Sequence, residues 1–172
     1  MQSSKHFNKN TKNEYFTPSP NRCVRYRREG TFCRLPGVYR MIGILLLTHE
    51  PLGQAFVATV THVFSGRPSQ LEALDVPADQ DPDETLRSAK EAVTRLNDGS
   101  GVIILTDVMG STPSNCCDTL IDPGQIEVIA GMSLPVLLSV ITYRNDTLDK
   151  VIKFALSSGQ NGIIHIEKTH PH

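Results

Sequence analysis

From residue 41 onward, short apolar runs along the chain alternate with amphipathic stretches. Residues 42–47 and 101–105 are continuous apolar runs of strand length, which are typical of parallel strands covered on both faces. Weaker strand patterns lie at 71–76, 126–130 and 162–166. Helical spacing predicts helices at 53–64, from 82 to just before Gly99, and at 147–157. The stretch 135–143 reads as a buried helix, although its apolar run is also compatible with a strand.

Two of the expected helices show which side faces the core. The helix at 53–64 places five apolar residues on one face: Phe56, Val57, Val60, Val63 and Phe64. The next helix begins with a capping Asp81 followed by Pro82 at the first helical position. Its predicted buried stripe consists of Leu86, Ala89, Val93 and Leu96.

Strands that alternate with helices predict an α/β fold built from βαβ units with right-handed crossovers. We expect a three-layer α/β/α sandwich, with a mostly parallel central sheet of about five strands and helices on both faces. In such sheets, ligands bind beyond the carboxyl ends of the strands, at the point where the strand order reverses. Functional residues are therefore sought at the ends of the apolar strands.

The segment 1–40 differs in character from the rest of the chain. Nine basic and two acidic residues precede Met41, a net charge of +7, and the remainder of the chain, whose total is -1, carries −8. The segment lacks apolar periodicity and is expected to be a disordered basic tail, because it cannot bury enough surface to offset its ordering entropy. A second interpretation is a translation start assigned too far upstream, with Met41 as the true first residue. We expect the domain to span 41–168, with a short tail at 169–172.

Composition limits the classes of function. A net charge of -1 gives no case for nucleic acid as a partner. No apolar run approaches the roughly 18 residues of a membrane span, so direct membrane insertion is not expected. The four cysteines form no CxxC pair and no zinc-ligand spacing, which favours free thiols in a reducing cytoplasm over a zinc site.

Both long apolar strands end in residues that carry chemistry. The first ends at Thr48 and His49, and an imidazole is a good nucleophile when a carboxylate on its other N–H fixes the tautomer. Asp107, which follows the second strand, is the expected orienting residue. The backbone N–H groups of the next residues, at the start of a helix, and nearby hydroxyls can bind a phosphate. The candidate phosphate-binding residues are Thr48, Gly110, Ser111 and Thr112.

Three segments resemble one known family when they are taken in order: residues 42–49, residues 105–115 and residues 127–135. Over about 41–168, the chain resembles the mannose-type enzyme IIA domain of the bacterial phosphoenolpyruvate-dependent sugar phosphotransferase system. The resemblance implies that His49 is phosphorylated at Nε2, that Asp107 is its hydrogen-bonded partner, and that Thr112 contacts the phosphate. The chain departs from the usual family pattern at Met109, where an aromatic residue is common, and at Ser111, where a glycine is common.

The resemblance also implies partners. The donor would be the histidine-containing phosphocarrier protein, the acceptor an enzyme IIB domain or a regulatory target, and the domain would form a homodimer through a C-terminal strand. No metal or cofactor is needed. Two alternatives stay open: the phosphocarrier subunit of dihydroxyacetone kinase, and a non-catalytic regulatory module that is switched by phosphorylation of His49. The other histidines (His6, His62, His165, His170 and His172) are not expected to take part.

Overall fold

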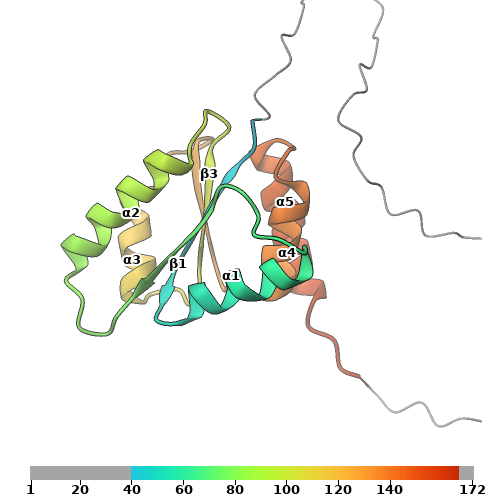
Figure 1. The fold of residues 1–172 in the computed structure, drawn as a ribbon, viewed down its shortest axis with the longest axis horizontal. Helices are drawn as coiled ribbons and strands as arrows, with labels where there is room; N and C mark the ends of the chain where they lie inside the picture. The colour runs from blue at the N-terminus through green and yellow to red at the C-terminus, as the bar shows by residue number, and fades with distance from the viewer. Residues whose placement is uncertain (1–39, 167–172) are drawn as a thin grey trace, which may run out of the picture. The chain divides into compact units, whose positions relative to one another are not determined.

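The computed structural model describes residues 40–166, which form a parallel sheet between two layers of helices (Figure 1). The strands are β1 (Gly43–His49), β2 (Leu71–Val76), β3 (Val102–Thr106) and β4 (Ile126–Ala130). Their order is β2-β1-β3-β4, and each neighbouring pair is parallel. The predicted α/β class, with a parallel sheet and helices on both faces, is confirmed, and the sheet has four strands where about five were expected.

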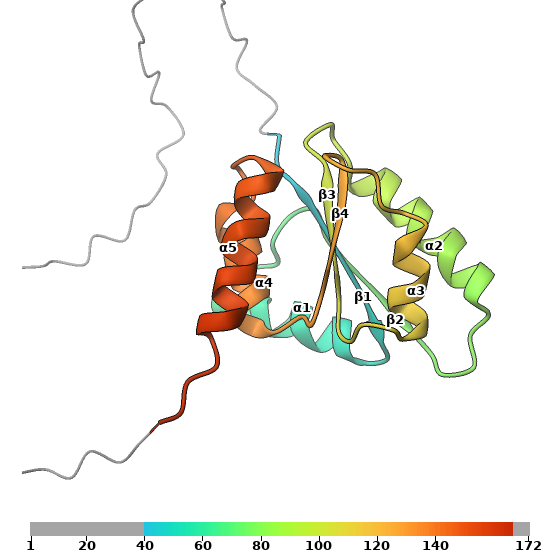
Figure 2. The same cartoon turned by 180° about the vertical axis from the view of Figure 1, so that it is seen from behind.

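Five helices cover the sheet: α1 (Leu52–Val63), α2 (Pro82–Leu96), α3 (Thr112–Asp118), α4 (Leu134–Tyr143) and α5 (Leu148–Asn161). The buried residues of α1, α4 and α5 share one hydrophobic cluster with the sheet, and those of α2 and α3 share a second cluster with it. Figure 2 shows α4 and α5 on one side of the strands and α2 and α3 on the other. The described domain is therefore a three-layer α/β/α sandwich.

The continuous apolar run of β1 follows from its central place in this sandwich. Ile44 and Leu46 belong to the first cluster, whereas Leu45 and Leu47 belong to the second, and all four are 0% exposed. Because successive side chains of a strand point to opposite faces, a strand covered on both sides needs an apolar residue at every position. Burial of each such side chain stabilises the fold by roughly 1.5–3 kcal/mol.

The helix predictions hold for most of their length. Residues 134–143 form a helix, which settles the alternative left open for this stretch. Asp81 caps α2 as expected, since its side chain accepts a hydrogen bond from the Asp83 N–H. The expected burial of Val63 and Phe64 is wrong: these side chains are 51% and 42% exposed. Val63 is the last residue of α1 and Phe64 lies beyond it, so the helical period no longer directs the Phe64 side chain toward the core.

The predicted strand at 162–166 is also wrong for this single chain. α5 continues to Asn161, and residues 163–166 have no regular secondary structure. Ile163, Ile164 and Ile166 are each at least 74% exposed. A strand requires pairing with a neighbouring strand, and none of the four strands of the described sheet pairs with this segment. The predictions for the segment before residue 40 and for 169–172 lie outside the described residues.

Candidate functional site

The two long apolar strands bring the predicted site residues to one edge of the sheet. β1 ends at His49, and Asp107 directly follows β3, the strand that pairs with β1 in parallel. The strand order changes direction at β1, because its neighbours β2 and β3 lie on opposite sides of it. This is the topological switch point of the sheet, where ligands of open α/β folds bind.

Asp107 holds both the backbone and the ring of His49. Its Oδ2 atom lies 2.8 Å from His49 Nδ1 and accepts a hydrogen bond of 3.1 Å from the His49 backbone N–H. Its Oδ1 atom accepts from the Val108 N–H at 2.8 Å. The carboxylate accepts only, so the short contact selects the tautomer with the proton on Nδ1. The other ring nitrogen, Nε2, then carries a free lone pair.

The two side chains of the site differ in their exposure to solvent. The Asp107 side chain is 12% exposed, whereas the His49 side chain is 48% exposed. Burial raises the pKa of Asp107, but hydrogen bonds from the His49 ring, the His49 N–H and the Val108 N–H outweigh burial and leave this pKa below its ordinary value. Asp107 is therefore a carboxylate at neutral pH, and it can stabilise positive charge that develops on the ring.

The loop after Asp107 contains the remaining predicted phosphate-binding residues. Gly110 has a φ of 84°, a left-handed conformation that favours glycine. The Ser111 hydroxyl donates to the Val108 carbonyl at 2.9 Å, and Ser111 is the N-cap residue of α3. Thr112 is the first residue of α3 and is exposed. The first N–H groups of a helix lack intrahelical acceptors, so this loop presents donors beside Asp107.

Thr48, which was predicted to bind phosphate, is buried near the end of β1. Its side chain is 0% exposed, and its hydroxyl donates to Asp75 Oδ1 at 3.1 Å. Successive side chains of a strand point to opposite faces, so Thr48 and His49 leave β1 in opposite directions. This placement does not favour a direct contact between Thr48 and a phosphate on His49.

Asp75 is a residue that the sequence analysis did not single out. It lies near the carboxyl end of β2, opposite Thr48 in the parallel register, and it accepts hydrogen bonds from the Gly53 and Gln54 N–H groups. The available signal was an acidic residue next to the end of a predicted strand. That signal is weak without the pairing register, which brings Asp75 beside β1.

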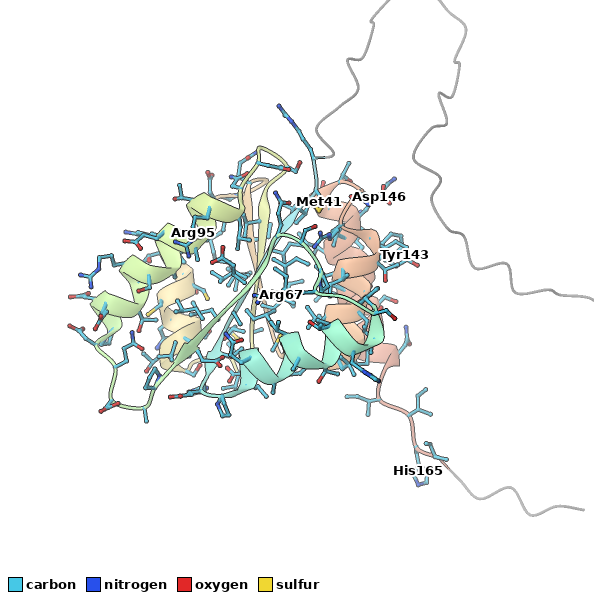
Figure 3. The ribbon with its side chains drawn as sticks, viewed as in Figure 1. Met41, Arg67, Arg95, Tyr143, Asp146 and His165 are labelled. Carbon is cyan, nitrogen blue, oxygen red and sulfur yellow. The ribbon has the colours of Figure 1, made fainter. Side chains whose placement is uncertain are left out.

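Neither of two hollows found in the domain is lined by His49 or Asp107. One hollow of about 420 Å³ is lined by residues 67–72 and by Arg95 and Leu96 of α2, and Figure 3 labels Arg67 and Arg95 on it. Another of about 420 Å³ lies between α4 and α5. Among residues 40–166, no group of three or more His, Cys, Asp or Glu side chains is placed to hold a metal ion. His62, in the last turn of α1, and His165, in the segment after α5, are both exposed.

None of the helices in the described part of the chain is both long enough and apolar enough to cross a membrane. Cys116 and Cys117 in α3 are buried free thiols, as the sequence analysis expected of the cysteines. Burial raises the pKa of Cys117 to about 12. These thiols are therefore protonated packing groups at neutral pH.

A family model described as "PTS system fructose IIA component" matches residues 43–156. Among curated proteins, the "PTS system mannose-specific EIIAB component" of Escherichia coli (strain K12) is 23% identical over 125 residues. That match covers 71% of this chain and 38% of the relative, so the chain spans less than half the length of the curated relative.

Two solved structures with a similar fold are components of the phosphotransferase system. A phosphotransferase system component EIIA from Streptococcus agalactiae has a TM-score of 0.65 and 20% identity, covering 73% of this chain and 97% of that one. The mannose/sorbose specific IIA subunit of the phosphotransferase system from Enterococcus faecalis has a TM-score of 0.68 and 17% identity, covering 77% of this chain and all of the other.

Proposed function

Because this chain belongs to the family of fructose IIA components of the phosphotransferase system, we propose that it is a phosphocarrier that accepts a phosphoryl group on His49 and passes it on. The observation that carries this proposal is the contact of 2.8 Å between Asp107 Oδ2 and His49 Nδ1 on a half-exposed ring. It favours the nucleophilic tautomer and leaves Nε2 for the phosphoryl group.

The proposed reaction exchanges one P–N bond for another. The Nε2 lone pair of His49 attacks the phosphorus of a donor phosphohistidine as the bond between that phosphorus and the donor nitrogen breaks. The electron pair of the broken bond stays on the donor ring. His49 keeps its Nδ1 proton, and Asp107 stabilises the charge that the ring acquires. Phosphoryl transfer depends chiefly on positioning and electrostatics, so a half-exposed ring fixed by one carboxylate suits it.

We assign the phosphate oxygens to the loop after Asp107. The donors that we assign are the N–H groups of Ser111 and Thr112 and the exposed Thr112 hydroxyl. The Gly110 N–H is donated to Ser114 Oγ at 3.4 Å, so Gly110 is left out of this assignment. Thr48 is left out of this assignment because its buried hydroxyl is donated to Asp75.

The half-exposed ring of His49 supports a protein as donor, because a large partner can reach it at the strand ends. We propose the histidine-containing phosphocarrier protein as donor and an enzyme IIB domain as acceptor, both in the cytoplasm. The name of the E. coli relative, an EIIAB component, supports a IIB acceptor.

We also propose a homodimer. Three isoleucines of segment 163–166 are at least 74% exposed, and exposed apolar residues in an extended segment favour pairing with another chain. β4 is an edge strand of the sheet and offers unpaired backbone groups to such a segment. Sedimentation of the wild type and of Ile164→Asp tests this: the wild type should be a dimer and the variant a monomer. A wild-type monomer would contradict the proposal.

The central test is phosphorylation of the full chain with phosphoenolpyruvate, enzyme I and the histidine-containing phosphocarrier protein, followed by intact mass. The wild type should gain the mass of one phosphate and His49→Ala should gain none. His62→Ala and His165→Ala are matched controls, because each removes an exposed histidine from an element other than β1, and both should be phosphorylated like the wild type. A phosphate adduct on His49→Ala would refute the assignment.

A further inference from the structure

Helix α1, which directly follows the His49 turn, lacks a cap of its own. Its N-cap residue is Pro51, which makes no side-chain capping bond. The first N–H groups of a helix need an acceptor from outside the helix. Asp75 of β2 supplies it: its Oδ1 accepts from the Gly53 N–H at 2.8 Å and its Oδ2 from the Gln54 N–H at 3.2 Å.

The Asp75 carboxylate also accepts a hydrogen bond from the residue before His49. The buried Thr48 hydroxyl donates to Asp75 Oδ1 at 3.1 Å, so one side chain holds the residue preceding His49 and the residues that begin α1. Next to it on β2, the Val76 carbonyl accepts from the Glu50 N–H at 3.2 Å. The residues on both sides of His49 are therefore hydrogen-bonded to β2.

Gly53 makes the close approach of α1 to Asp75 feasible. A Cβ atom at this position would overlap Asp75 Oδ1 and lie 2.9 Å from Thr48 Oγ1. Because contacts below 3.0 Å force a displacement, any side chain here would separate the Asp75 carboxylate from the helix start. A glycine at this position keeps the Asp75 hydrogen bonds short.

We propose that Asp75 is a positioning residue for phosphoryl transfer, an inference that rests on the function proposed for His49. Two carboxylates, one from each side of β1, position His49 together. Asp107 holds the His49 ring and backbone N–H, and Asp75 holds the flanking Thr48 and the start of α1. Asp75 acts through the backbone, because its hydrogen bonds go to Thr48, Gly53 and Gln54 and none goes to His49.

Loss of this carboxylate should lower the rate of transfer more than it lowers donor binding. A displacement of about 1 Å in a reacting group can cost about 100-fold in rate. For Asp75→Ala we expect a fall of about 10- to 100-fold in kcat for phosphorylation, with the KM for the donor protein little changed. Asp75→Asn keeps one acceptor oxygen for the helix start, and asparagine caps helices about as well as aspartate, so it should restore most of the rate.

The chain offers a matched control for the structural role of a cap. Asp81 caps α2 through the Asp83 N–H at 3.0 Å. Asp81→Ala removes a helix cap as Asp75→Ala does, and it should lower the melting temperature without changing kcat. Gly53→Ala keeps the carboxylate but displaces it, so its kcat should fall. Gly66→Ala is the control for that change, because a Cβ there meets nothing within 4 Å.

A second readout uses the unphosphorylated protein and does not depend on the proposed function. In ¹⁵N NMR spectra of the His49 ring, Asp75→Ala should shift the Nδ1 and Nε2 signals, whereas Asp81→Ala should leave them at the wild-type positions. Unchanged ring signals in Asp75→Ala, or equal losses of kcat in Asp75→Ala and Asp81→Ala, would overturn the inference. If Asp75→Ala does not fold, Asp75→Asn and Gly53→Ala decide by the same readouts. A wild type that takes no phosphate would refute the proposed function and leave the NMR test standing.

Discussion

Replacement of Asp107 by asparagine removes one negative charge from the site and keeps the size of the side chain. In the wild type, Asp107 Oδ2 faces two donors of His49 and Oδ1 faces the Val108 N–H. An amide has one oxygen, so one of these sides meets an NH₂ group. The loss of that hydrogen bond should destabilise the fold by about 1 kcal/mol, and the fold should persist.

The effect on rate should be larger, because positive charge develops on the ring during transfer. Two unit charges about 4 Å apart interact by about 1 kcal/mol in water and about 4 kcal/mol near a protein surface. The 12% exposed Asp107 side chain and the 48% exposed His49 side chain place this pair between the two limits. A loss of about 2–3 kcal/mol corresponds to a rate lower by about 30- to 150-fold.

The assay is the initial rate of phosphorylation by the donor protein, measured by intact mass on quenched samples. Asp81→Asn is the matched control: it makes the same chemical change at the cap of α2, whose side chain accepts from the Asp83 N–H, and asparagine caps equally well. It should react at the wild-type rate. If Asp107→Asn also reacts at that rate, Asp107 does not stabilise the ring during transfer, and the reasoning fails.

Three further predictions concern stability and reactivity. Burial raises the pKa of Asp98, but hydrogen bonds, chiefly that with the Ser100 side chain, outweigh burial and leave this pKa below its ordinary value. The Asp98 carboxylate therefore stabilises the fold above about pH 4, and this stabilisation is lost at lower pH. The gap in unfolding free energy between wild type and Asp98→Asn should therefore shrink between pH 7 and pH 3 in urea titrations. Cys116 and Cys117 should react with a thiol reagent at pH 8 only after unfolding, since both are buried and have raised pKa values. The measurement uses a variant in which the two N-terminal cysteines are replaced by serine, and rapid labelling of the folded variant would contradict the prediction. Leu46→Ala should cost about 2–5 kcal/mol in the same urea assay, because Leu46 is 0% exposed, whereas Leu156→Ala, at a side chain 50% exposed, should cost less than about 0.5 kcal/mol.

The sequence alone determined the layers of this domain. Continuous apolar strands at 42–47 and 101–105 are required of parallel strands with helices on both faces, and the structure has these strands at the centre of the sheet. The same pattern pointed to His49 and Asp107, because an apolar strand must end where polar residues begin. The carboxyl ends of parallel strands share one edge of the sheet, so the sequence could also predict that the two meet.

The tertiary structure alone decided how the strands pair and therefore which donors and acceptors meet. The hydroxyl of Thr48 could face either the site or β2, and only the parallel register opposite Asp75 directs it to that carboxylate. Asp75 itself is a polar residue in a weak strand pattern until the register brings it to the start of α1. Residues 163–166 have a strand pattern, yet without a neighbouring strand in the described chain they form none. Each segment encodes its own helix or strand pattern. Its hydrogen-bond partners, however, often lie in segments far away along the chain, and only the packed fold brings those segments together.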